Sequence, residues 1–169
     1  MSDDRREALR RKYLGLGAGE LTATALFAAC AAFVVVPRFE HPAAAGALWS
    51  ALIPLLVVLA QAGVYWLLAR GWVKVGRMPV ALAALYTVFR WLNPALLTAG
   101  LFGMVMWWPQ PLSVALLCLG VWIFGVVEYV NYFVVRLSYP FSEGFAKVGQ
   151  WRVPRLIRDV REATGALVG

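Results

Sequence analysis

Three ionisable residues, Glu20, Arg90 and Glu128, lie inside otherwise apolar stretches of the sequence. Charged side chains are costly in hydrocarbon, so they are usually placed against protein or water and often mark a ligand or proton site. A glutamate can carry a proton or bind a cation, whereas an arginine binds carboxylate or phosphate oxygens. These three residues are therefore the first candidates for chemistry.

Polar neighbours extend this set at helical spacing, because side chains three, four or seven residues apart share one face of a helix. Arg90 has such neighbours on both sides, and Glu128 has two shortly after it. A further pair, four residues apart, lies in an earlier apolar stretch. The candidates for ligand binding are Arg90, Glu128, Asn131, Asn93, Glu20, Tyr86, Tyr132, Gln61 and Tyr65. These patterns assign no catalytic residue.

The composition indicates that a membrane protein positions these residues. Of the 169 residues, 62% are hydrophobic and only 15% are charged, and the mean hydropathy is +0.70. These values exclude an ordinary soluble domain of this size. Four apolar stretches are long enough to cross a bilayer, at about 20 residues for each span. They run over about 13–36, 48–69, 82–108 and 112–137.

The predicted fold is an all-α integral membrane protein, a four-transmembrane-helix bundle with short loops. Residues 1–12 form a basic N-terminal tail, residues 13–137 the transmembrane domain and residues 138–169 a basic C-terminal tail. A basic leader before an apolar run also describes a signal peptide. The apolar run continues past Cys30 to Val36, so we expect an uncleaved first span.

The basic residues of the loops predict the orientation. Both tails are rich in Lys and Arg, as is the connection with Arg70, Lys74 and Arg77, whereas the other two loops contain Arg38 alone. The positive-inside rule then places both termini in the cytoplasm and predicts a multi-pass protein of the cell (inner or plasma) membrane. Tryptophans near the predicted span ends agree with this, as interface aromatics do: Trp49, Trp72, Trp107 and Trp108.

The C-terminal tail contains a predicted amphipathic helix between Trp151 and Leu167. Its apolar residues fall on one side at helical spacing, namely Val153, Leu156, Ile157, Val160 and Ala163. We expect an interfacial helix that lies flat on the inner leaflet, with Trp151 as its anchor. The alternative is a solvated basic tail.

The candidate residues form one polar layer in the cytoplasmic half of the predicted bundle. At about 1.5 Å per residue, Glu20, Gln61, Arg90 and Glu128 all lie roughly 9–13 Å from the predicted cytoplasmic ends of their spans. We expect Arg90 to pair with Glu128 or Glu20, because unpaired charges are costly there. Pro94 removes the usual donor to the Arg90 carbonyl, which leaves that oxygen available to a ligand.

Two other interpretations of the layer remain open. The polar groups can be interhelical hydrogen-bonding contacts, which small bundles need because apolar packing gains little in lipid. Arg90 can also snorkel from the interface, if the third span begins at Trp91.

In the first helix, Gly15 and Gly19 offer a surface for close packing, within the bundle or between subunits.

The favoured hypothesis is a small polytopic inner-membrane protein that binds, and in one version transports, a small molecule or lipid headgroup. Arg90 favours an anionic ligand, whereas Glu20 and Glu128 favour protons or cations. A basic rim consists of Arg70, Lys74, Arg77 and Arg136. One rival is a membrane enzyme acting on a lipid-soluble substrate, with Glu128 as general acid or base. The other is a nonenzymatic subunit of a membrane complex.

The expected partners follow from the same features. They are the lipid bilayer, anionic lipid at the basic inner face, and a second copy of the chain or a membrane partner protein. Nucleic acid is not expected, because basic residues beside membrane spans are explained by orientation and by lipid. No cofactor or metal is expected, since His41 is the only histidine and has no second ligand in a suitable pattern.

Overall fold

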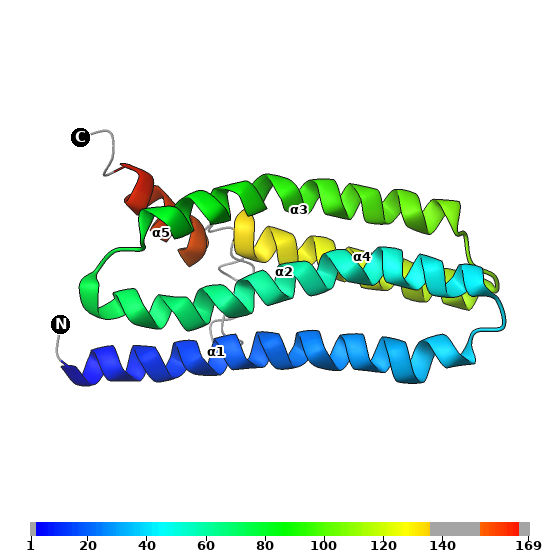
Figure 1. The fold of residues 1–169 in the computed structure, drawn as a ribbon, viewed down its shortest axis with the longest axis horizontal. Helices are drawn as coiled ribbons and strands as arrows, with labels where there is room; N and C mark the ends of the chain where they lie inside the picture. Colours follow the sequence, from blue (N-terminus) through cyan, green and yellow to red (C-terminus); the bar gives the residue numbers. More distant parts are fainter. Residues whose placement is uncertain (1–2, 136–152, 166–169) are drawn as a thin grey trace, which may run out of the picture.

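The chain forms a bundle of long helices joined by short turns (Figure 1). The computed structural model describes residues 3–135 and 153–165, and these ranges contain no strand. Four helices are long and apolar enough to cross a membrane, as in a multi-pass membrane protein. This confirms the expectation of an all-helical chain with four such helices.

The helices follow one another with little intervening chain. In order, the elements are α1 (Asp3–Cys30), a π-helical turn η1 (Ala31–Val35), a 3-10 turn η2 (Val36–Arg38), α2 (Pro42–Val75), α3 (Val80–Met106), α4 (Leu112–Phe133) and α5 (Arg155–Gly165). Residues 3–12, predicted as a basic tail, belong to α1. Helix α3 continues through residues 80–106 without a break at Trp91, although Pro94 lies inside it.

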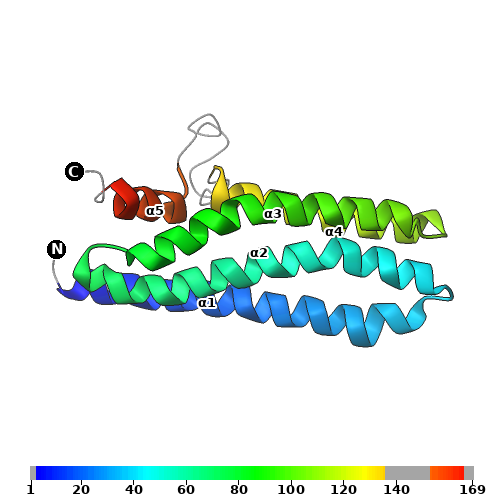
Figure 2. The ribbon, with the colours of Figure 1, turned by 45° about the horizontal axis from the view of Figure 1, so that its top comes forward.

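The start of α1, the end of α2 and the start of α3 lie at one end of the bundle, whereas α4 stops short of them and α5 lies beyond its end (Figures 1 and 2). We call this the terminal end and the opposite one the distal end. At the terminal end α2 stops at Gly76, whose φ is 91° and whose N–H donates to the Trp72 carbonyl at 2.7 Å. Glycine adopts this left-handed conformation without steric cost, so the chain turns at once into α3.

Helix α2 is the central element and contacts α1, α3 and α4. Its crossing with α3 is close, because a Cβ on Gly100 would lie 2.5 Å from the carbonyl oxygen of Ser50. Pro54, inside α2, leaves that carbonyl without its usual helical donor. In α1, a Cβ on Gly15 or Gly19 would have no neighbour within 4 Å. The predicted close-packing surface is therefore not used within the described bundle.

Buried apolar side chains form two clusters along the bundle. The distal core consists of Ala31, Ala47, Leu48, Ala51, Leu52, Leu55, Leu59, Met104 and Cys118. The terminal core consists of Tyr13, Tyr65, Ala69, Trp72, Met78, Ala83, Tyr86, Phe133, Leu156, Ile157, Val160 and Ala163. Other large apolar side chains point outward, including Phe33 and Met106, which are 81% and 82% exposed. Such an outer surface is typical of contact with lipid.

The apolar residues on one face of α5 are buried in the terminal core, where α5 packs against α3 and α4, whereas Val153 just before the helix is 47% exposed. The sequence predicts that this face rests on lipid, but protein covers it, because apolar segments of the longer helices extend beside α5. Trp72, expected as an interface aromatic, is also buried, with 7% of its surface exposed. The expected anchor, Trp151, lies outside the described residues.

Candidate functional site

Three of the predicted site residues form a hydrogen-bonded contact between α2 and α3, in which Oδ1 of Asn93 is left without a partner among the described residues. The side-chain amide of Asn93 donates to Oε1 of Gln61 at 2.7 Å, and the Tyr86 hydroxyl donates to the Gln61 carbonyl oxygen at 2.8 Å. All three residues are buried. Their polar atoms hold two helices together, as the interhelical-contact interpretation expects.

Arg90 does not make the contacts expected of it. Its carbonyl oxygen accepts a hydrogen bond from the Tyr129 hydroxyl at 3.1 Å. The expectation that this oxygen is open to a ligand is therefore wrong, because α4 supplies the donor that Pro94 removes. No ion pair joins Arg90 to Glu20 or Glu128 among the described residues.

The two glutamates lie between α1 and α4 and find neutral partners. The Tyr132 hydroxyl donates a hydrogen bond to the Glu20 carboxylate. The Asn131 side chain hydrogen-bonds Glu128, and the two carboxylates are close enough for their charges to repel. A tyrosine and an amide thus take the position that Arg90 was expected to hold.

A cavity of about 220 Å³ opens at the terminal end, beside the Asn131 and Tyr132 side chains that contact the two glutamates. Four elements supply its walls, so it exists only where α1, α2, α4 and α5 meet. Its lining is Leu9, Lys12, Tyr13 and Leu16 from α1, Trp66 from α2, Asn131 and Tyr132 from α4, and Leu156, Arg155 and Pro154 at the start of α5. Of the nine predicted site residues, Asn131 and Tyr132 line it.

The cavity lining contains two cations, Lys12 and Arg155, and no acid. The Arg155 guanidinium carbon lies 5.0 Å from the ring centroid of Tyr13, so a cation–π contact joins α5 to α1. The Tyr13 hydroxyl is buried and has no hydrogen-bond partner among the described residues. The Trp66 indole nitrogen is buried as well and lies close to the Tyr132 hydroxyl. Cations and hydrogen-bond donors together suit an anionic ligand.

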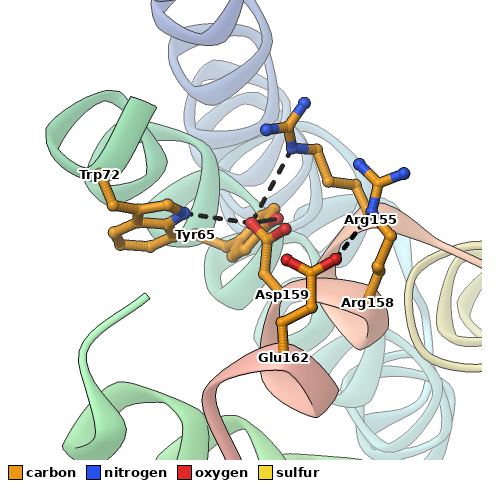
Figure 3. Close-up of polar contacts among 6 residues, drawn as sticks. All are labelled: Tyr65, Trp72, Arg155, Arg158, Asp159 and Glu162. Atoms are coloured by element: carbon orange, nitrogen blue, oxygen red, sulfur yellow. Dashed lines mark hydrogen bonds and ion pairs between the residues drawn. The ribbon is translucent and has the colours of Figure 1, made fainter. Parts of the chain in front are cut away.

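Asp159 of α5 fixes this wall of the cavity. Its Oδ2 accepts hydrogen bonds from the Tyr65 hydroxyl at 2.8 Å and from the Trp72 indole nitrogen at 3.1 Å, and it lies 3.8 Å from Nε of Arg155 (Figure 3). Asp159 as a whole residue is only 7% exposed, and it lies among the apolar side chains of the terminal core. The hydroxyl of the predicted site residue Tyr65 therefore contacts α5, while its ring lies 5.7 Å from the ring of Tyr86. A second cavity, of about 280 Å³, is lined by Asp159 and Glu162 and shares Leu9 and Arg155 with the first.

Several of these residues were missed from the sequence. Asp159 carries a recognisable signal, because it is an acid three residues after Leu156 and four before Ala163, inside the apolar face of α5. Lys12 and Arg155 look like other basic residues beside a span, and no pattern distinguishes them. Of the predicted basic rim, Arg70 and Arg77 do not line the first cavity. Arg136 and the Lys74 side chain lie outside the described residues.

Comparison with known proteins adds no constraint. No family model matches the chain, and neither a curated protein nor a solved structure matches it. The function is therefore argued from the site itself.

Proposed function

We propose that the chain is a multi-pass membrane protein that binds an anionic group in the terminal cavity, at the depth of the lipid headgroups. The observation that carries this proposal is a cavity whose described lining contains Lys12, Arg155 and the buried Tyr13 hydroxyl, which has no partner among the described residues, and no acid. It keeps the class of ligand expected from the sequence, a small molecule or lipid headgroup, and selects a negative charge.

The helix lengths support the headgroup depth. Helix α4 has 22 residues and spans about 33 Å, close to the roughly 30 Å of a hydrocarbon core. Helix α2 has 34 residues and spans about 51 Å, so it extends well past α4. Asn131 and Tyr132, near the end of α4, then lie at the membrane boundary. By the positive-inside rule this boundary faces the cytoplasm.

This placement also revises the depth of the polar layer. Glu20 lies about 27 Å from Arg38 at the distal end, at about 1.5 Å per residue. It is then near the boundary and not 9–13 Å inside it. Arg90 likewise lies close enough to the boundary for its side chain to snorkel, which supports that interpretation of the residue.

Phosphate is the anionic group that this lining suits best. A guanidinium can bind two phosphate oxygens at once, and an ammonium adds a second positive charge. The Tyr13 hydroxyl and the Trp66 N–H add neutral donors. The phosphate can belong to a lipid headgroup or to a soluble molecule. Glu128 does not line the cavity, so this geometry does not favour the rival enzyme.

The direct test is a titration of the purified protein in neutral detergent with short-chain phosphatidic acid, short-chain phosphatidylcholine and inorganic phosphate. Binding of phosphatidic acid alone supports a lipid ligand. Binding of phosphatidic acid and inorganic phosphate supports a soluble anion. Binding of neither anion, or equal binding of phosphatidylcholine, contradicts the proposal.

Two substitutions locate the binding in the cavity. Lys12→Gln and Arg155→Gln should each weaken phosphatidic acid binding by about tenfold, corresponding to about 1.4 kcal/mol. The matched control is Arg11→Gln, because Arg11 is adjacent in sequence but its side chain is 81% exposed and pairs with Glu7 at the surface. An equal loss in the control would indicate unspecific attraction to positive charge.

A further inference from the structure

We infer that Asp159 is a positioning residue for this site: by docking α5 it holds Arg155 over the cavity, so that ligand binding and docking of α5 stabilise each other. The inference rests on the proposed function for its ligand. Its structural part, the attachment of α5 through Asp159, stands on contacts of its own.

The first step is the cost of burying Asp159. A buried carboxylate needs donors, and one left without them is strongly destabilising. In Figure 3 the side chains of Tyr65 and Trp72 on α2 point to the carboxylate, and both donate to the same oxygen. These two donors are present only when α5 lies against α2. Asp159 therefore favours one docked position of α5 over any other apolar surface.

The second step is the position of Arg155, one helical turn before Asp159. Its Nε lies 3.8 Å from Oδ2 of Asp159, and its guanidinium carbon lies over Tyr13 of α1. The chain just before and at the start of α5 supplies Pro154, Arg155 and Leu156 to the cavity wall. When α5 leaves, the cavity loses this wall and one of its two cations.

The third step is reciprocity. If docking of α5 raises the affinity for the anion, the anion must favour docking by the same factor. The inference places undocked α5 on the membrane surface, which an amphipathic helix with exposed Arg158 and Arg161 can bind. Occupancy of the cavity then shifts α5 from that surface to the bundle.

The experiment measures docking and binding in the same variants. Spin labels on Arg11→Cys and Arg161→Cys, with Cys30 and Cys118 replaced by alanine, report the distance between α1 and α5 in phosphatidylcholine nanodiscs. Tyr65→Phe removes one donor to Asp159 and keeps the ring in the core. We expect a broader distance distribution and about tenfold weaker binding of short-chain phosphatidic acid. Asp159→Asn, which removes the charge and keeps the shape, should act in the same direction.

The matched control is Tyr129→Phe, which also removes a tyrosine hydroxyl donor but leaves Asp159 untouched. It should change neither the distance distribution nor the affinity. Adding phosphatidic acid to Tyr65→Phe should narrow the distribution again. It should not do so when Lys12→Gln is added, because that change weakens the cavity without altering the contacts of Asp159.

The outcomes separate the inference from the proposed function. If Tyr65→Phe broadens the distribution while the affinity stays unchanged, the coupling is wrong and the binding site stands. If phosphatidic acid binds but never narrows the distribution, the coupling is wrong as well. If the unmodified protein binds neither phosphatidic acid nor inorganic phosphate, the proposed function fails and the coupling fails with it.

Discussion

The hydroxyl of Tyr129 on α4 donates a hydrogen bond of 3.1 Å to the carbonyl oxygen of Arg90 on α3. In an uninterrupted helix this oxygen would accept from the N–H of residue 94, which proline lacks. A side chain of the next helix thus replaces a backbone donor. The irregularity in α3 is a point of attachment for α4 and not an open ligand position.

This relationship predicts a double-mutant cycle. Tyr129→Phe should lower the free energy of unfolding by about 1 kcal/mol, because the Arg90 carbonyl loses its donor. In a Pro94→Ala background the backbone supplies a donor again, so the same change should cost clearly less. Unfolding in sodium dodecyl sulfate, followed by circular dichroism, measures both costs. Equal costs in the two backgrounds would contradict the assignment.

The crossing of α2 and α3 predicts a strong effect of one methyl group. Gly100→Ala places a Cβ against the carbonyl oxygen of Ser50, so the helices must separate. We expect a loss of about 1–3 kcal/mol in unfolding free energy. Gly120→Ala in α4 is the control, since a Cβ there meets nothing within 4 Å. It should be neutral or slightly stabilising, because alanine favours the helix.

The buried contact of Gln61 and Asn93 predicts a separation of stability from binding. Asn93→Ala should lower stability by about 1 kcal/mol, a typical value for an interhelical hydrogen bond in a membrane protein. It should leave phosphatidic acid binding unchanged, because Asn93 does not line the cavity. Asn131→Ala, which alters the lining, should weaken that binding. If Asn93→Ala weakened the binding and Asn131→Ala did not, the ligand site would lie at the α2–α3 contact.

The proposed orientation predicts the accessibility of introduced cysteines. With Cys30 and Cys118 replaced by alanine, a cysteine at Arg11 should react with a membrane-impermeant maleimide only in inverted vesicles. A cysteine at Gln110, in the turn at the distal end, should react only in right-side-out vesicles. The proposal places three membrane crossings, those of α1, α2 and α3, between these two positions. Labelling of both positions from the same side would therefore contradict it.

Much of the fold could be predicted from the sequence because hydropathy acts over whole helices. Four apolar stretches gave four helices, and the turn at Gly76 follows from the glycine itself. The lengths were less predictable, since charged residues such as Arg5 to Lys12 signal a membrane boundary but not the end of a helix. Helix α1 continues through them from Asp3.

The site could be predicted only in part. Helical spacing grouped Glu128, Asn131 and Tyr132, and the last two line the cavity whereas Glu128 does not. It could not show that Tyr65 meets Asp159, 94 residues later, because that contact depends on where α5 packs. Charge balance suggested Arg90 as the partner of a carboxylate, yet the two carboxylates have neutral partners: Tyr132 of α4 for Glu20, and Asn131 of the same helix for Glu128. Pairings between helices depend on tertiary packing, which spacing within one helix does not specify.

The burial of α5 also has a consequence for the order of biosynthesis. Its donors and its apolar neighbours come from α2, α3 and α4, and its cation contact comes from α1, so α5 can dock only after these four preceding helices have been made and packed together. Until they have assembled, a newly made chain presents the apolar side of α5 to its surroundings. Burial of that side therefore depends on correct packing of the bundle, and a misassembled chain would leave it accessible to chaperones and proteases.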